Sequence, residues 1–91
     1  MAIKTKSTAV STTAVAITLA DTDRTADGFA TILNWGAVSC FIGGATVTVA
    51  TGFPLAPGAK IDLIELKNTE VLYAICNTAE STTVKSLQTQ A

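Results

Sequence analysis

Between Gly28 and Ala59 the chain reads GFATILNWGAVSCFIGGATVTVATGFPLAPGA, thirty-two residues without a charged side chain. Glycine, proline and asparagine interrupt this run every few residues, which is typical of turns between short strands. The pieces between the turns are rich in valine, isoleucine, phenylalanine and threonine, which fit a pleated sheet. Apolar residues do not keep the three-to-four spacing of a helix here. The run therefore predicts several short β-strands.

The same pattern continues on both sides of this run. We expect strands at residues 14–19, 29–34, 37–42, 46–50, 61–66, 71–76 and 81–87, with a Pro- and Gly-rich loop at 51–58. Between Ile61 and Leu66 the alternation of apolar residues slips by one position, which a bulge or two buried faces would explain. The predicted fold is all-β, a small antiparallel β-sandwich or β-barrel of about six to eight short strands.

The length of 91 residues allows one domain with a single core. Residues 1–8 are polar and have no clear pattern, so we expect an extended N-terminal arm followed by one β domain at 9–91. The arm contains Ile3 and Lys4, and we consider it a candidate for strand addition to a neighbouring molecule.

The charge pattern argues against several classes of function. Charged residues make up 14% of the chain, against about 25% in an average globular protein. The six Lys and Arg residues are scattered, whereas nucleic-acid binding needs clustered cations, so we expect no nucleic-acid partner. There is no histidine, the commonest general base and metal ligand. We therefore expect no enzyme activity, no catalytic residue, no metal and no cofactor.

Three smaller features leave alternatives open. Cys40 and Cys76 each lie in an apolar run, which indicates two buried thiols or, alternatively, one bridge between neighbouring strands. Asp21, Asp23 and Asp27 are spaced like part of a calcium loop but lack its glycine and terminal glutamate. Residues 29–50 are long enough to span a bilayer, although their glycines and β-branched residues would make a poor helix, and we expect no membrane association.

Two of the expected strands are apolar on both faces. In residues 37–42 and 71–76, each face carries aliphatic or aromatic side chains. A sheet with one solvated face alternates apolar and polar residues, so these strands need a second cover. We expect another subunit to supply it, the alternative being a closed barrel with scattered apolar residues outside. The interface candidates are Ile3, Lys4, Trp35, Phe41, Phe53, Leu55, Leu72 and Tyr73.

About half of the chain carries a string with a family resemblance. It contains FIGG (41–44), GFPLAPG (52–58), IDL (61–63), LYAI (72–75) and TVKSL (83–87). This string resembles small structural proteins of tailed bacteriophages, which are found as capsid decoration or head-associated proteins and as β modules on fibres. The resemblance implies an all-β protein that binds the virion as a symmetric oligomer without a cofactor. The last strand of such proteins commonly has an arginine followed by a hydrophobic and acidic ending, and residues 85–88 (KSLQ) depart from that pattern.

These observations together lead to one expected function. We expect a non-enzymatic capsid decoration (cement) protein that forms a homo-oligomer, preferably a trimer, and binds the major capsid protein. It would be made in the host cytoplasm and located on the capsid surface of the virion. The alternative is a receptor- or glycan-binding β module of a tail or fibre, or another head–tail component.

Overall fold

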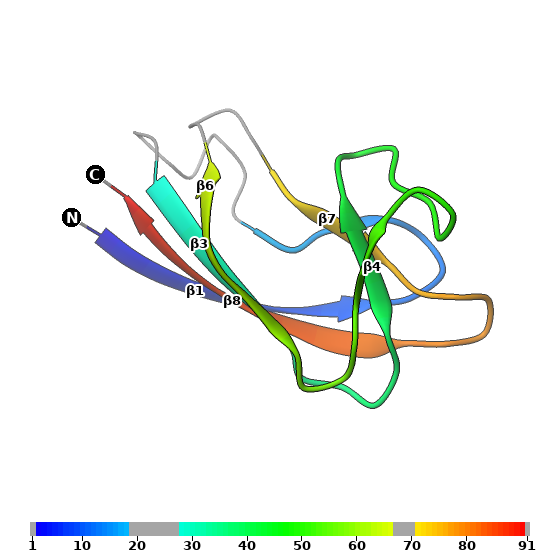
Figure 1. Cartoon of the computed structure of the whole chain (residues 1–91). Coiled ribbons are helices and arrows are strands. Elements are labelled where there is room, and N and C mark those ends of the chain that lie inside the picture. The colour runs from blue at the N-terminus through cyan, green and yellow to red at the C-terminus, as the bar shows by residue number, and fades with distance from the viewer. Residues whose placement is uncertain (1, 19–27, 67–70, 91) are drawn as a thin grey trace.

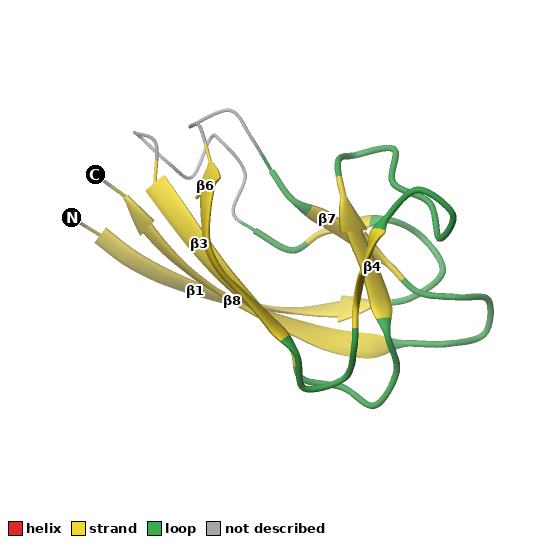
Figure 2. Cartoon of the chain, in the orientation of Figure 1, coloured by secondary structure: helices red, strands yellow, loops and turns green. Residues whose placement is uncertain are grey.

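The computed structural model describes residues 2–18, 28–66 and 71–90. Within these residues it contains eight strands: β1 (Ala2–Val10), β2 (Val15–Ala16), β3 (Gly28–Asn34), β4 (Cys40–Gly43), β5 (Phe53–Leu55), β6 (Lys60–Leu66), β7 (Tyr73–Ile75) and β8 (Thr82–Gln90). The described part of the chain contains no helix (Figure 2). The prediction of an all-β protein is confirmed.

The strands form two four-stranded antiparallel sheets. The long sheet has the order β1-β8-β3-β6, and the short sheet has the order β2-β7-β4-β5. Figure 1 shows β4 and β7 lying against one end of the long sheet, while the two chain ends lie side by side at its other end. Of the two architectures that the sequence predicts, the structure is therefore the sandwich.

The segment expected to be an N-terminal arm is extended and forms strand β1. It pairs with β8 without interruption, from Ala2 opposite Gln90 to Val10 opposite Thr82. Ile3 and Lys4 are thus part of the long sheet of their own chain. Since β1 is the last strand on its side of the sheet, its second edge has no partner strand among the described residues.

The slip in alternation at residues 61–66 corresponds to a β-bulge, the first of the two explanations that the sequence left open. Ala30 pairs with Ile64 and Ile32 pairs with Ile61, so two steps along β3 correspond to three steps along β6. The extra residue places Ile61 and Ile64, which are three positions apart, on the same face of the sheet, and both pack against the core.

The predicted strand at residues 46–50 is wrong, and a strand forms inside the predicted loop instead. Thr48 and Thr51 join side-chain hydroxyls at 2.9 Å, and each backbone N–H donates to the other residue's hydroxyl, at 3.1 and 3.2 Å. These local bonds hold a turn and compete with a sheet ladder. β5 contains Pro54 and forms the edge of the short sheet, a position where a residue without an N–H is tolerated.

The core lies between the two sheets. The long sheet contributes Val10, Ile32 and Val84, and the short sheet contributes Cys40, Ile42, Leu55 and Ala74; Ile17 and Cys76 complete the cluster. Alternate residues along β8 are buried, from Thr82 to Gln88. The face of the long sheet that carries the intervening residues is therefore its outer face.

A buried asparagine connects the two sheets. The Asn34 side chain is completely buried. Its amide donates hydrogen bonds to the carbonyl oxygens of Val38 at 2.8 Å and Leu55 at 2.9 Å. Its oxygen accepts from the Gly36 N–H at 3.2 Å and from the Thr82 hydroxyl at 2.7 Å. The side chain thus joins β3, β5 and β8 and fixes the turn that leads to β4.

Cys40 and Cys76 are buried free thiols and do not form the bridge that the sequence left open as the alternative. Cys40 begins β4, and Cys76 follows β7, the strand paired with β4. Desolvation by burial raises the pKa of Cys40 from 9.0 to about 11 and also raises the pKa of Cys76. Cys76 donates a weak hydrogen bond to the Val10 carbonyl at 3.6 Å. Burial therefore favours the neutral thiol at both positions, and a neutral thiol is a poor nucleophile.

Replacing Asn34 tests its role in joining the sheets. Asn34→Ala leaves the Val38 and Leu55 carbonyls and the Thr82 hydroxyl without their partner. Buried polar groups without a partner cost about 1–3 kcal/mol each, so we expect a loss of at least about 3 kcal/mol. In thermal unfolding this corresponds to a Tm lower by more than about 10 °C. The control is Asn77→Ala at an exposed position; equal Tm values for the two variants would contradict the role.

Gly36 and Gly44 form a matched pair for a second test. A Cβ on Gly36 would lie 2.8 Å from Thr82 Cβ and 2.9 Å from its Cα, whereas a Cβ on Gly44 would meet no atom within 4 Å. We expect Gly36→Ala to lower the free energy of unfolding by about 1–3 kcal/mol, because the neighbouring strand must move. Gly44→Ala should change it by less than about 1 kcal/mol. Urea denaturation measures both, and a neutral Gly36→Ala would show that the turn is not tightly packed.

The thiols give a pH-dependent prediction. The folded state prefers the neutral thiol of Cys40. The free energy of unfolding therefore keeps the full contribution of this thiol below pH 9.0 and loses it as the pH rises towards about 11. At pH 8 we expect a disulfide exchange reagent to modify neither cysteine in the folded protein and both after unfolding. Rapid modification of the native protein would contradict burial. Failure to detect two thiols in the unfolded, unreduced protein would indicate a bridge.

Candidate binding surface on the outer face of the long sheet

The outer face of the long sheet carries side chains that no other segment among the described residues covers. Strand pairing places Ser7, Lys85, Leu33 and Lys60 in one row across β1, β8, β3 and β6. The next row contains Thr5, Leu87 and Thr31. Because residues two apart on a strand share a face, both rows lie on the same side of the sheet. The surface therefore draws its side chains from all four strands.

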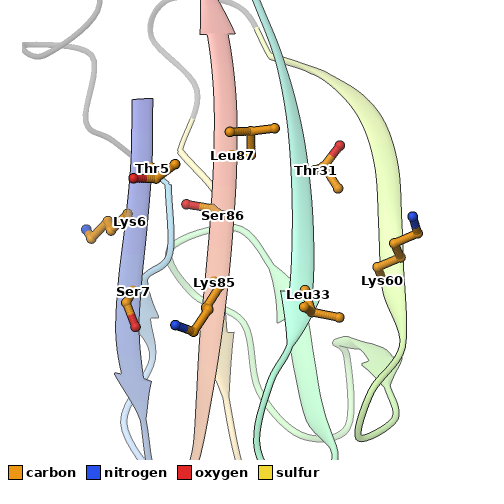
Figure 3. Close-up of a pocket in the computed structure, with 9 residues that line it drawn as sticks. All are labelled: Thr5, Lys6, Ser7, Thr31, Leu33, Lys60, Lys85, Ser86 and Leu87. Atoms are coloured by element: carbon orange, nitrogen blue, oxygen red, sulfur yellow. The ribbon is translucent and has the colours of Figure 1, made fainter. Parts of the chain in front are cut away.

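The two rows line a shallow hollow of about 420 Å³ (Figure 3). The residues of these rows combine hydroxyl groups, two leucines and two lysines: Thr5, Ser7, Thr31, Leu33, Lys60, Lys85 and Leu87. Lys6 and Ser86 also line the hollow, although alternation along β1 and β8 places them on the other face of the sheet. Lys60 forms an exposed ion pair with Asp62 at 3.7 Å. The hollow thus has an apolar floor with positive charge around it, which suits an anionic or amphipathic partner better than a neutral polar one.

Large exposed hydrophobic side chains extend this surface along β3 and β8. The exposed fractions are 66% for Trp35, 46% for Phe29 and 45% for Leu87. Phe29 is at the start of β3, and Trp35 directly follows its end. The Lys85 ammonium lies 5.5 Å from the centre of the Trp35 ring, which is a cation–π contact. Burying large side chains of this kind contributes about 1.5–3 kcal/mol each, so this face can drive association.

The interface candidates from the sequence are divided among several environments. Trp35 and Phe53 are exposed, the latter at 63%. Phe41, Leu72 and Tyr73 are half-buried. Leu55 is only 3% exposed and belongs to the core, because it faces inward from β5. The structure therefore corrects the proposal that Leu55 docks on a partner. Ile3 and Lys4 are located on β1, where only their backbone is described.

The loop after β4 supplies part of the second cover that we expected from another subunit. Val47 is buried, and its side chain would be 2.7 Å from a Cβ placed on Gly43. A Cβ on Gly52 would be 2.6 Å from Cβ of Phe41. The loop therefore packs directly on the outer side of β4. The expectation that a second molecule must cover this strand is corrected to that extent.

Sequence reasoning did not select Phe29, Leu33, Lys85 and Leu87 as surface residues. Simple alternation along the strand expected at residues 29–34 groups Phe29, Thr31 and Leu33 on one face, and the burial pattern agrees with that grouping. The available signal was that Phe29 and Leu87 share their faces with Thr31 and Lys85, respectively. A polar neighbour two residues away indicates a face that meets solvent.

Two further kinds of site to consider among the described residues are a metal site and a membrane-spanning helix. Within residues 2–18, 28–66 and 71–90, no group of three or more His, Cys, Asp or Glu side chains could hold a metal ion. Asp21, Asp23 and Asp27 lie outside the described residues. No helix in the described part is long and apolar enough to cross a membrane. Residues 29–50, considered above as a helical span, form β3, β4 and turns.

Comparison with known proteins adds no family to this description. No protein-family model matches the chain, and no curated protein matches it significantly. The bacteriophage resemblance of residues 41–87 therefore remains a prediction from the sequence.

Proposed function

We propose that this chain is a non-enzymatic structural protein of a virion that decorates the capsid surface as an oligomer and stabilises the shell. The observation that carries the proposal is the uncovered outer face of the long sheet. Phe29, Trp35 and Leu87 are exposed there on a sheet that a sandwich would otherwise leave polar. The sequence resemblance to small phage structural proteins points to the same class.

The outer face would stabilise a shell through binding alone. A protein that binds the assembled state and not the separated state shifts the equilibrium towards assembly by mass action. Apolar side chains on a rigid sheet suit this role, because little conformational freedom is lost when they are buried. A trimer around a local three-fold axis would bring three copies of this face to neighbouring shell proteins.

A receptor- or glycan-binding module is the second candidate, and Trp35 favours it. An exposed indole beside a lysine offers a stacking surface for a sugar ring. The Thr5, Ser7 and Thr31 side chains line the same hollow and supply hydroxyl groups. A glycan site depends on Trp35 and these hydroxyls, whereas shell binding depends on Leu87 and Phe29.

Substitution at Leu87 tests the proposed function. We expect Leu87→Asp to bind purified particles at least about tenfold more weakly, since a charge replaces a half-exposed apolar side chain at the contact. Its Tm should match that of the parent protein, because the position is outside the core. The control is Ala45→Asp, which adds the same charge in the exposed turn after β4. Affinity is measured by co-sedimentation with particles and oligomeric state by light scattering.

Two results would contradict the proposed capsid decoration function. Mass spectrometry of particles should find on the order of hundreds of copies each, as a symmetric shell requires, and a handful would assign the chain to the tail. Unchanged binding of Leu87→Asp together with sugar binding that is lost in Trp35→Ala would support the glycan module.

A further inference from the structure

The four sheet edges differ in how well they are protected against pairing with another strand. An edge strand presents a row of unpaired N–H and C=O groups, and short length, proline, bulges and charge are the usual protections. β2 has two residues and β5 has three, one of them Pro54. β6 contains the bulge. β1 has nine residues and regular pairing, with neither proline nor bulge, so the charges of Lys4 and Lys6 are its remaining protection. Among the described strands, β1 is therefore the edge most suited to accept another strand.

The charges on β1 determine which kind of strand can pair with its free edge. Residues 2–10 contain Lys4 and Lys6 and no acidic residue. Lys6 lines the hollow, and in Figure 3 its side chain points away from β8, past the unpaired edge of β1. Lys85 is on the adjacent strand, opposite Ser7. A strand added at this edge would meet positive charge on both sides of its backbone.

These lysines disfavour pairing between two copies of β1. In an antiparallel pairing centred on Thr5, Lys4 of each copy would be opposite Lys6 of the other. Like charges that face each other across two strands are destabilising, and opposite charges are stabilising. The same lysines therefore oppose a second copy and favour an acidic strand.

We propose that β1 binds an extended acidic segment of a partner protein, which adds to the long sheet as a fifth strand. The identity of the partner as a shell protein rests on the proposed function, whereas the chemistry of the edge does not. Backbone hydrogen bonds along β1 would supply affinity, and carboxylates near Lys6 would supply selectivity. The added strand would continue the row of Thr5 and Ser7 and widen the outer face. β1 thus accepts a strand instead of being donated as an arm.

The test uses the whole protein and two synthetic peptides. The acidic probe is acetyl-Thr-Glu-Val-Glu-Val-Glu-Thr-amide, and its control carries Gln in place of each Glu. Fluorescence anisotropy should show that the Gln peptide binds about tenfold more weakly, because the favourable charge contacts with the lysines of β1 are lost. Affinity for the acidic peptide should decrease with salt. Lys6→Gln should weaken it about two- to fivefold, while Thr46→Glu, with the same change in net charge in an exposed turn, should leave it unchanged.

Amide hydrogen exchange distinguishes strand addition from binding by charge alone. Successive residues of a strand direct their N–H groups to opposite edges. Every second amide of residues 2–10 is therefore bonded to β8 already, and the others should gain protection when the acidic peptide binds. Binding without this alternating gain would overturn the proposal, as would equal affinity for the two peptides. A dimer of the protein that protects the same amides would assign the edge to a second copy and overturn it too.

The peptide and particle experiments can fail independently. Peptide binding at β1 with no binding to particles would reject the capsid function and keep the strand-accepting edge. Particle binding that depends on Leu87, with no protection of β1, would keep the function and reject the edge.

Discussion

The buried side chain of Asn34 is the constraint on which the rest of the structure depends. Its hydrogen bonds to Val38, Leu55 and Thr82 hold two sheets and a turn in one arrangement. Residues of a strand alternate between faces, so an inward Asn34 also places Ala30 and Ile32 inward. Phe29 and Leu33 must then point outward. The exposed apolar surface is thus a consequence of one buried polar group.

This alternation shows where sequence reasoning reached its limit. The two faces of residues 29–34 could be grouped correctly from the sequence, but not assigned to core or solvent. Phe29 and Leu33 make their face the more apolar one, and hydrophobicity alone would bury it. Tertiary hydrogen bonds to Asn34 reverse that preference, because an amide with four satisfied contacts is stable inside the protein. A local pattern contains Gly36 and Val38 but not Leu55 and Thr82, which lie 21 and 48 residues away.

Local patterns were sufficient elsewhere. The slip at residues 61–66 predicted a bulge because it reflects geometry within one strand. The valines and threonines at 46–49 gave the wrong answer, since Thr48 and Thr51 bond to each other and close a turn. That turn places Val47 against Gly43 and so covers the short sheet from within the chain. Three of the four large exposed hydrophobic side chains, Phe29, Trp35 and Leu87, are on or next to strands of the long sheet, whereas the sequence pattern had pointed to strands of the short one.

The outer face and the edge of β1 belong to one surface with two kinds of specificity. Leu33 and Leu87 attract any apolar partner, so by themselves they would also favour aggregation. The lysines beside them change that outcome, because a second copy brings the same positive charges to the same place. The acidic extended partner that we propose would satisfy the backbone of β1, the charges and the apolar floor together. In that proposal the lysines leave a long sheet edge available to an acidic strand while they discourage pairing with another copy of the same chain.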